Sequence, residues 1–404
     1  MTARATRAVY AVFILSGFAF ASWASRIPSI RDALQLSPGS LGLVLLAIAA
    51  GSVLSMPFAG LVVRRIGTAR TVGTMSLVAA AGLATVGLGY QVGVIPVVIG
   101  LFALGVGNGT WDVAMNVEGS AVERALGKAI MPRFHAGFSV GTVAGALLGA
   151  AMVAAGAPAS MHLLAVAAVV AVVGPIAVRD FLPDPREDTG GGARRSPLAA
   201  WTEPRTLLIG LFVFAAAFTE GTGNDWLAVA TIDGYGVSAA LGTLTFALFL
   251  SAMTVGRWFG PGLIDRHGRV AIVRLFGLLA LLGLAMIIWS PDFAIAMAGA
   301  VLWGLGAALG FPVGMSAAGD EPEHAAARVS VVATIGYVAF LAGPPLIGFL
   351  GEHTGTLHAL SLTGGFVAIG LLISGVLREP ARGPVRRPGD AEPAGRSPRT
   401  DGSA

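Results

Sequence analysis

This 404-residue chain has little charge and no cysteine. Asp, Glu, Lys and Arg together make up 12% of its residues, whereas soluble domains carry roughly 25%. Hydrophobic residues make up 55%, and the mean hydropathy is +0.78. So few charged side chains exclude an ordinary water-soluble domain and predict a protein embedded in a lipid bilayer.

The lack of cysteine excludes disulfides, thiolate nucleophiles and cysteine-based metal sites. The six histidines show no metal-ligand spacing, so we expect neither a metal site nor a cofactor. A phosphate-binding Gly-x-x-x-x-Gly-Lys-Ser/Thr motif is also missing, which argues against direct use of ATP. With no candidate catalytic residue, we predict that the protein is not an enzyme.

Twelve apolar runs are long enough to cross a bilayer, which takes about 20 mostly apolar residues in a helix. Six runs fall in each half of the chain. They begin near residues 7, 39, 69, 94, 132, 160, 205, 240, 270, 292, 329 and 356. A Leu-Gly pair, an apolar run and an arginine-glycine turn fill residues 41–67, and this layout recurs over residues 241–269. We therefore predict an all-α membrane protein of twelve transmembrane helices in two pseudo-symmetric six-helix bundles.

Two polar segments interrupt this pattern. Residues 181–204 are rich in proline, glycine and arginine and separate the sixth run from the seventh, so we expect a cytoplasmic linker. Residues 378–404 hold almost no bulky apolar side chains and are expected to form a disordered cytoplasmic tail. The predicted bundles are residues 1–180 and 205–377.

The basic residues indicate how the chain is oriented in the membrane. Only Arg26 and Arg31 fall on the side opposite to the other basic loops. The positive-inside rule then places both termini in the cytoplasm of a multi-pass protein in the bacterial cytoplasmic (inner) membrane. This sorting also accounts for the isoelectric point near 10.1, and we expect no nucleic-acid partner.

Four polar side chains interrupt the fourth and seventh runs. Asp112 and Asn116 are four residues apart, and Glu220 and Asn224 repeat this spacing, so each pair shares a helix face. A charge at the bilayer centre costs about 2.5 to 3.5 kcal/mol on insertion scales, and such residues usually face an aqueous path. A desolvated carboxyl can exchange a proton near neutral pH, which predicts proton coupling. The alternative is that either acid only hydrogen-bonds a neighbouring helix.

Arg26 and Asp225 lie at similar depths in the two halves. At 1.5 Å per residue, Arg26 is about 27 Å along the first run and Asp225 about 28 Å along the seventh, both near the outer face. We predict that they pair to close an outer gate. A fixed structural pair, or no contact between them, is the alternative.

Small residues recur every four positions in two of the runs. They extend from Gly137 to Gly149 in the fifth run and from Ala252 to Gly260 in the eighth. Helices in lipid associate through close packing of small residues. The two rows are therefore candidates to pack on each other.

The turn after the second run of each half resembles the loop motif Gly-x-x-x-Asp-Arg-x-Gly-Arg-Arg/Lys of the major facilitator superfamily. The second half keeps the acid but has Pro261 at the leading glycine, whereas the first half has Arg64 at the acid and Thr68 at an arginine. The resemblance covers residues 7–377 and implies that the acid helps to latch the cytoplasmic side. The matching positions are Gly60, Arg65, Gly67, Asp265, Arg266, Gly268 and Arg269.

A narrower resemblance concerns the fourth and fifth runs. Asp112, Asn116 and residues 134–141 are similar to the fucose-permease group, in which an acid at this place is implicated in proton-coupled sugar uptake. Residues 23–28 and 220–226 look more like a poorly characterised bacterial branch related to that group. The resemblance implies that runs one, four, seven and ten line the substrate and proton cavity. The lining residues would be Phe20, Trp23, Trp111, Asp112, Asn116, Glu220, Asn224, Trp303 and Phe311.

The function that these features predict is secondary active transport. Two bundles would rock around a midplane site and move a small solute, sugar-like or of mixed polarity, by alternating access with proton coupling. Small-molecule solute, protons and the bilayer are the expected partners, and a monomer is the expected state. One alternative is a proton-coupled efflux antiporter for drugs or metabolites, and another is a receptor or scaffold that has lost transport.

Overall fold

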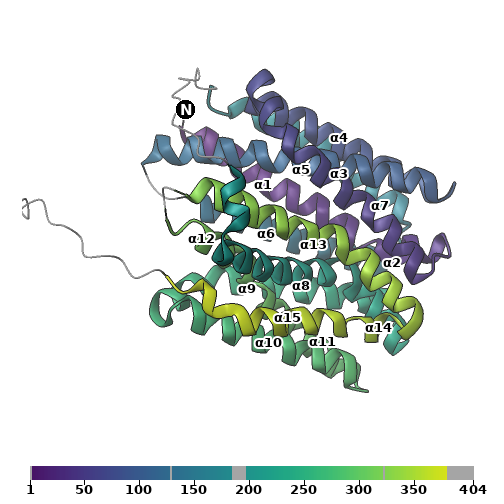
Figure 1. The fold of residues 1–404 in the computed structure, drawn as a ribbon. Helices are drawn as coiled ribbons and strands as arrows, with labels where there is room; N and C mark the ends of the chain where they lie inside the picture. The colour runs from purple at the N-terminus through teal and green to yellow at the C-terminus, as the bar shows by residue number, and fades with distance from the viewer. Residues whose placement is uncertain (1, 128–129, 184–196, 322–323, 380–404) are drawn as a thin grey trace, which may run out of the picture.

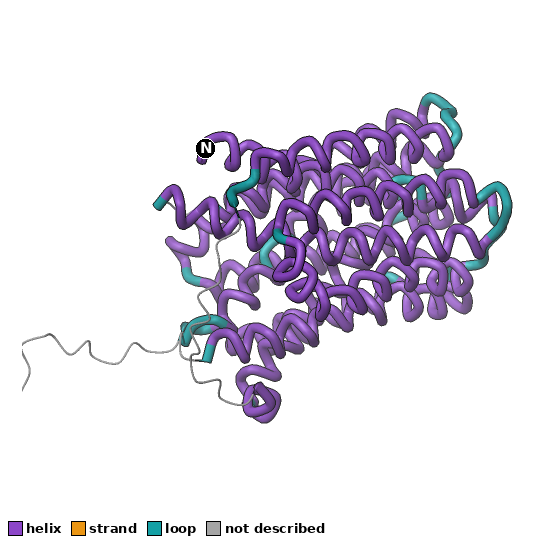
Figure 2. The backbone as a smooth tube through the Cα atoms, turned by 90° about the horizontal axis from the view of Figure 1, so that it is seen from above, coloured by secondary structure: helices purple, strands orange, loops and turns teal. Residues whose placement is uncertain are grey.

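The computed structural model describes residues 2–127, 130–183, 197–321 and 324–379. Within these ranges the chain is helical apart from short connections, and no strand occurs (Figure 2). Twelve helical segments of the described part are long and apolar enough to cross a membrane. Each begins within a few residues of a predicted run, so the predicted fold class is confirmed.

Seven α-helices form the first half of the chain, and the first of its six spans is divided between α1 and α2. They are α1 (Thr2–Ala24), α2 (Ile27–Ala33), α3 (Pro38–Ile66), α4 (Thr68–Gly89), α5 (Val94–Leu126), α6 (Met131–Ala154) and α7 (Ala159–Ala177). A 3₁₀ turn, Val178–Asp180, extends α7.

Eight α-helices form the second half, where the tenth span is divided between α11 and α12 and the twelfth between α14 and α15. They are α8 (Pro204–Tyr235), α9 (Ala239–His267), α10 (Arg269–Trp289), α11 (Phe293–Ala307), α12 (Gly310–Ala318), α13 (Ala325–Thr354), α14 (Thr356–Ala359) and α15 (Ser361–Ile373). The 3₁₀ turns Pro197–Thr202 and Ser374–Leu377 flank this half. Most of the predicted linker, residues 184–196, and the tail from residue 380 lie outside the described residues.

The internal repeat extends to individual packing contacts. Gly105 of α5 faces the backbone of Ile48 on α3, and about 200 residues further along Gly304 of α11 faces the backbone of Phe249 on α9. At both places a side chain larger than hydrogen would strike the neighbouring helix. The two halves therefore share packing geometry as well as hydropathy.

The backbone conformation explains why the loop motif contains glycine in both halves. Gly67 joins α3 to α4 with φ +85°, and Gly268 joins α9 to α10 with φ +82°. A positive φ is costly for residues with a Cβ atom and free for glycine. Each glycine thus permits the sharp reversal between two spans.

The glycine row of the fifth span does not pack on the eighth span as we predicted. The fifth and eighth spans do pack beside each other, as α6 and α9, but the glycine row points elsewhere: Gly141 faces the carbonyl of Ile14 and Gly145 that of Phe18, both on α1. In the eighth span, Gly256 meets Leu305 and Ala308 of the tenth span. Both rows are packing surfaces, but each serves its own half.

The two halves occupy the upper and lower parts of the molecule in Figure 1. They meet where α3 packs beside α13 and where α6 packs beside α9. The labels of α2 and α14 lie at the end away from the N-terminus, which we call the distal end; the other is the proximal end (Figure 1).

Replacing Gly141 by alanine is expected to destabilise the first half, because the added methyl group would strike the carbonyl of Ile14. The cost expected of overpacking is about 1–3 kcal/mol. Thermal unfolding in detergent measures it. Gly365→Ala is the control, since that glycine of α15 has open space around its Cβ position. An equal unfolding temperature for both variants would contradict the packing role of Gly141.

Candidate functional site

Asp112 and Asn116 lie near the middle of α5 and are half-buried. The Asn116 amide donates to the backbone oxygen of Asp112 at 2.8 Å and to its carboxylate at 3.3 Å. Within the described residues, Asp112 has no cationic partner. The predicted shared face is therefore present, and it holds a carboxyl group that no cation neutralises.

Glu220, at the middle of α8, does have such a partner. Its Oε2 accepts a hydrogen bond from Nη2 of Arg257 at 2.7 Å. The Arg257 Nε also donates to the carbonyl oxygen of Ala308 at 3.3 Å, where the tenth span breaks between α11 and α12. One guanidinium thus joins the seventh, eighth and tenth spans.

Both polar centres interact with the opposite half. Arg257 on α9 lies close enough to His135 on α6 for an electrostatic interaction. Asp112 on α5 likewise lies close enough to Tyr337 on α13 to interact with it electrostatically. The sequence analysis left out Arg257 and Tyr337. An arginine within an apolar run could have indicated Arg257 as a site residue. It follows Gly256 in the row of small residues from Ala252 to Gly260, which we interpreted only as a packing surface.

Most of the aromatic side chains that we predicted to line the cavity are buried and not accessible. Trp23, Trp111 and Trp303 are buried inside their own halves and present no face to a solute in this conformation. Trp303, for example, packs edge-on against Phe249 with ring centroids 5.2 Å apart. Both phenylalanines of the predicted set, Phe20 and Phe311, are partly exposed.

Asn224 and Asp225 follow Glu220 on α8 and are half-buried. The Oδ1 atom of Asn224 is buried without a hydrogen-bond partner. Among the described residues, Asp225 forms no ion pair, and in particular none with Arg26. The predicted outer gate is not formed by these two residues here.

Arg26 instead lies inside the first half. Its Nε donates to Nδ1 of His162 at 3.0 Å and its Nη1 to the carbonyl oxygen of Ala157 at 3.1 Å. The side chain is 2% exposed and lies between the ends of α1 and α6. The partial negative charge at helix C-termini stabilises a cation at such a place.

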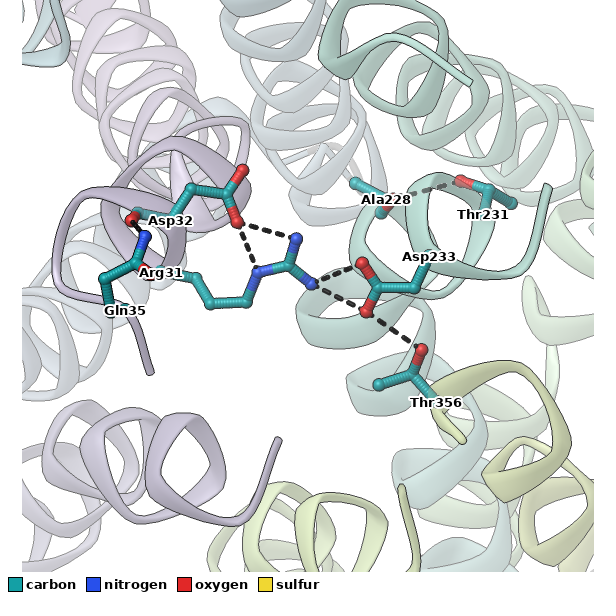
Figure 3. Close-up of polar contacts among 7 residues, drawn as sticks. All are labelled: Arg31, Asp32, Gln35, Ala228, Thr231, Asp233 and Thr356. Atoms are coloured by element: carbon teal, nitrogen blue, oxygen red, sulfur yellow. Dashed lines mark hydrogen bonds and ion pairs between the residues drawn. The ribbon is translucent and has the colours of Figure 1, made fainter. Parts of the chain in front are cut away.

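An ion pair between the halves exists farther along, at the distal end. Nη1 of Arg31 on α2 donates to both carboxylate oxygens of Asp233 on α8, at 2.8 and 2.7 Å (Figure 3). Asp32 binds the other side of the guanidinium, and Thr356 donates to Asp233 at 3.2 Å. Figure 3 shows Arg31 reaching from its own helix to Asp233 of the other half.

A second contact closes the same end. The backbone N–H of Gly39, in the first turn of α3, donates to Oε2 of Glu352 on α13 at 2.8 Å. A carboxylate is stabilised at a helix N-terminus by its free N–H groups. In the described ranges, every hydrogen bond and ion pair between the halves lies at the distal end.

The loop motif lies at the proximal end and acts within the second half. Arg269 binds Asp320 at 2.6 Å, and Arg205 binds the other oxygen of that carboxylate at 2.9 Å. Asp265 is exposed and forms no ion pair in the described part of the chain. The second-half motif therefore holds α8, α10 and α12 together through its last arginine rather than its acid.

Glu203 precedes α8 at this end and accepts a hydrogen bond of 2.5 Å from Nε of Arg328. This bond holds the pKa of Glu203 below its ordinary value. A lowered carboxyl pKa stabilises the folded state above the ordinary pKa, and the contribution is lost as the pH falls through the lowered value. The contact is therefore intact at neutral pH.

The second half contains an apolar crevice. Phe212, Phe276, Gly310 and Leu371 are among its lining residues, whereas Glu220 and Arg257 are not. Across the ranges that the structure describes, no group of three His, Cys, Asp or Glu side chains could hold a metal ion.

Comparison with known families decides the identity of the fold. A model described as Major Facilitator Superfamily matches residues 9–320 and again residues 235–402. The chain belongs to this superfamily. An uncharacterized transporter, y4wD, of Sinorhizobium fredii is 30% identical over 92% of the chain and 98% of its own length. The protein is thus a multi-pass membrane transporter of the Major Facilitator Superfamily.

Other similarities are more distant or more local. The crystal structure of the nucleoside transporter NupG matches with a TM-score of 0.70 at 13% identity, covering 92% of the chain and 98% of NupG. That of a D-xylose-proton symporter matches with a TM-score of 0.71 at 13% identity, covering 92% and 96%. The purine ribonucleoside efflux pump NepI of Salmonella typhimurium is 32% identical over 32% of the chain and 33% of the pump.

Asp233→Asn is expected to loosen the distal closure, because Arg31 loses its ionic partner in the other half. An exposed ion pair contributes about 0.2–1 kcal/mol, which corresponds to an increase of up to about fivefold in the open fraction. The native chain has no cysteine, so an Asn224→Cys background can be labelled from the distal face with a membrane-impermeant maleimide. The labelling rate should rise in Asp233→Asn.

Asp32→Asn is the matched control for this experiment. Asp32 binds the same guanidinium but belongs to α2, so its loss removes no contact between the halves. Exchanging the charges, with Arg31→Asp and Asp233→Arg together, should restore slow labelling. If Asp32→Asn raised the labelling rate as much as Asp233→Asn does, the closing role of Asp233 would be contradicted.

Proposed function

We propose that this protein is a secondary active transporter that moves a small polar solute by alternating access and is driven by protons. The main support comes from the environment of Asp112. This residue is a half-buried carboxyl in the middle of α5, it has no cationic partner among the described residues, and it is close enough to Tyr337 of the other half to interact with it. Such a group belongs to a site where the halves meet and charge is exchanged.

The contacts between the halves support alternating access. They are concentrated at the distal end, where Arg31 binds Asp233 and Gly39 binds Glu352. At the proximal end the described ion pairs stay within the second half. A carrier whose halves are joined at the distal end, and whose described residues form no such ion pair between the halves at the proximal end, is one of the two states that alternating access requires.

The arginines support an orientation for this state. Most basic residues lie at the proximal end, so we assign that end to the cytoplasm by the positive-inside rule. Both termini are then cytoplasmic, the membrane is the bacterial cytoplasmic membrane, and the polar closure at the distal end lies on the outer side. We propose that the transporter acts as a monomer, since each half pairs with the other half of the same chain.

The two acids have different roles in this proposal. Arg257 forms an ion pair with Glu220, so this carboxylate has a counter-ion within the membrane. Asp112 has no such partner, and an ionised carboxyl without one is expensive in a membrane. Asp112 is therefore the proton carrier, and Glu220 with Arg257, Asn116 and Asn224 forms the polar part of the solute site.

Import of a sugar-like solute is the first choice of direction and cargo. The fold similarity to a D-xylose-proton symporter and to a nucleoside transporter is compatible with it, and the fucose-permease resemblance of Asp112 and Asn116 points the same way. A proton-coupled efflux antiporter is the second choice, favoured by the local similarity to the efflux pump NepI. The intramembrane acids that transport needs are present, which argues against a receptor or scaffold.

Asp112→Asn is expected to abolish proton-driven accumulation without blocking exchange. One proton moving through 100 mV contributes about 2.3 kcal/mol, enough for a roughly fifty-fold gradient. Proteoliposomes with an imposed gradient and a panel of labelled sugars, sugar acids and nucleosides measure accumulation and counterflow. The wild type should concentrate its solute, and Asp112→Asn should only equilibrate it.

Asp112→Glu, which keeps a carboxyl group, is the control and should retain part of the accumulation. The sign of the pH change inside energised vesicles separates import from efflux. Accumulation by Asp112→Asn equal to that of the wild type would remove Asp112 as the proton carrier.

A further inference from the structure

Arg257 has an accessible edge that no protein group uses. Its Nε donates to Ala308 and its Nη2 to Glu220, whereas Nη1 has no hydrogen-bond partner. The Nη1 atom is not among the buried polar atoms, and the side chain is 26% exposed. Two N–H donors of an intramembrane guanidinium are thus free.

The contact with Glu220 uses little of what a guanidinium offers. One carboxylate oxygen meets one nitrogen, although the fork of an arginine matches both oxygens of a carboxylate or phosphate. The side chain of Glu220 is itself 17% exposed, so it can leave the guanidinium for a neighbouring position. The pair has the geometry of an exchangeable partner rather than a sealed ion pair.

The surroundings of this free edge favour an anion. His135, from the opposite half, is exposed and close enough to Arg257 to interact with it. A neutral imidazole can donate one N–H to an oxyanion. The acid of the other centre, Asp112, interacts with Tyr337 on α13, whereas Arg257 belongs to α9. Arg257, Glu220 and His135 are therefore the charged and titratable groups that meet at this edge.

We infer that the transported solute carries a carboxylate or phosphate group, which binds the free edge of Arg257 and displaces Glu220. This inference rests on the proposed function, because it takes this site to be the solute site. The solute anion takes the place of the Glu220 carboxylate on the guanidinium, so Arg257 keeps an anionic partner throughout the exchange.

The same guanidinium reaches the break in the tenth span. Arg257 holds the carbonyl of Ala308, which lies between α11 and α12. The guanidinium that would bind the anion is thus also the group that holds the carbonyl at this break, by a bond of 3.3 Å.

Matched pairs of probes test the class of solute. Purified protein in weakly buffered detergent solution is titrated with glucose and glucuronate, glycerol and glycerol 3-phosphate, and benzyl alcohol and benzoate. We expect one or more anionic members to raise the unfolding temperature, and their neutral partners to leave it unchanged. The sugar-acid and phosphate arms distinguish carboxylate from phosphate recognition.

Two variants assign the effect to the ion pair. Arg257→Gln should abolish the stabilisation by anions. Glu220→Gln frees the guanidinium, so this variant should bind the same anions about tenfold more tightly. It keeps the test valid if Arg257→Gln does not fold. Arg274→Gln is the control, because that arginine binds Ser374 elsewhere in the same half.

Several outcomes would overturn the inference. They are stabilisation by neutral members equal to that by anions, anion binding undiminished in Arg257→Gln, and no anion binding in either the wild type or Glu220→Gln. Failure of the proposed function differs from these. It would be Arg257-dependent anion binding in detergent without transport of any solute in proteoliposomes.

Discussion

Every ionised group within the spans of this protein must be compensated, because hydrocarbon supplies neither water nor counter-ions. Arg257 and Glu220 meet this requirement together, where the seventh and eighth spans lie beside the broken tenth span. Asp112 has no cation among the described residues, and neither does Asp225 on α8, so both differ from Glu220 in this respect; we propose Asp112 as the group whose charge state a proton changes. The division of labour between the two acids follows from which of them has an arginine.

Close helix packing makes such a site possible. Glycines let α6 lie against α1, and Gly105 and Gly304 hold equivalent positions in the two halves. Each half is therefore a rigid unit with its tightest contacts inside itself. The halves also pack on each other along α3 and α13 and along α6 and α9, but the hydrogen bonds and ion pairs that join them in the described ranges lie at one end, where Arg31 binds Asp233. Two rigid units joined by a few exchangeable polar contacts can rock without losing their cores.

The sequence was sufficient for features that belong to one segment. Length and hydropathy place twelve spans, and a four-residue spacing puts Asp112 and Asn116 on one face. Pairing between segments was not accessible, because depth along a helix says nothing about which way a side chain points. Arg26 and Asp225 have similar depths, yet Arg26 turns into its own half toward His162. A pattern of small residues likewise shows that a helix packs closely, not on which neighbour.

One helix connects the two regions that matter for transport. Asp233, at the distal closure, lies thirteen residues beyond Glu220 on α8, which corresponds to about 20 Å along a continuous helix. A helix of this kind does not compress, so a shift that follows the exchange of Glu220 at Arg257 is transmitted to Asp233 as a movement of the whole rod. The distal ion pair is short and partly exposed, and therefore it can break at modest cost when α8 moves. The proposed binding site and the distal closure each have an acid on α8, and for this reason we expect the two to be coupled.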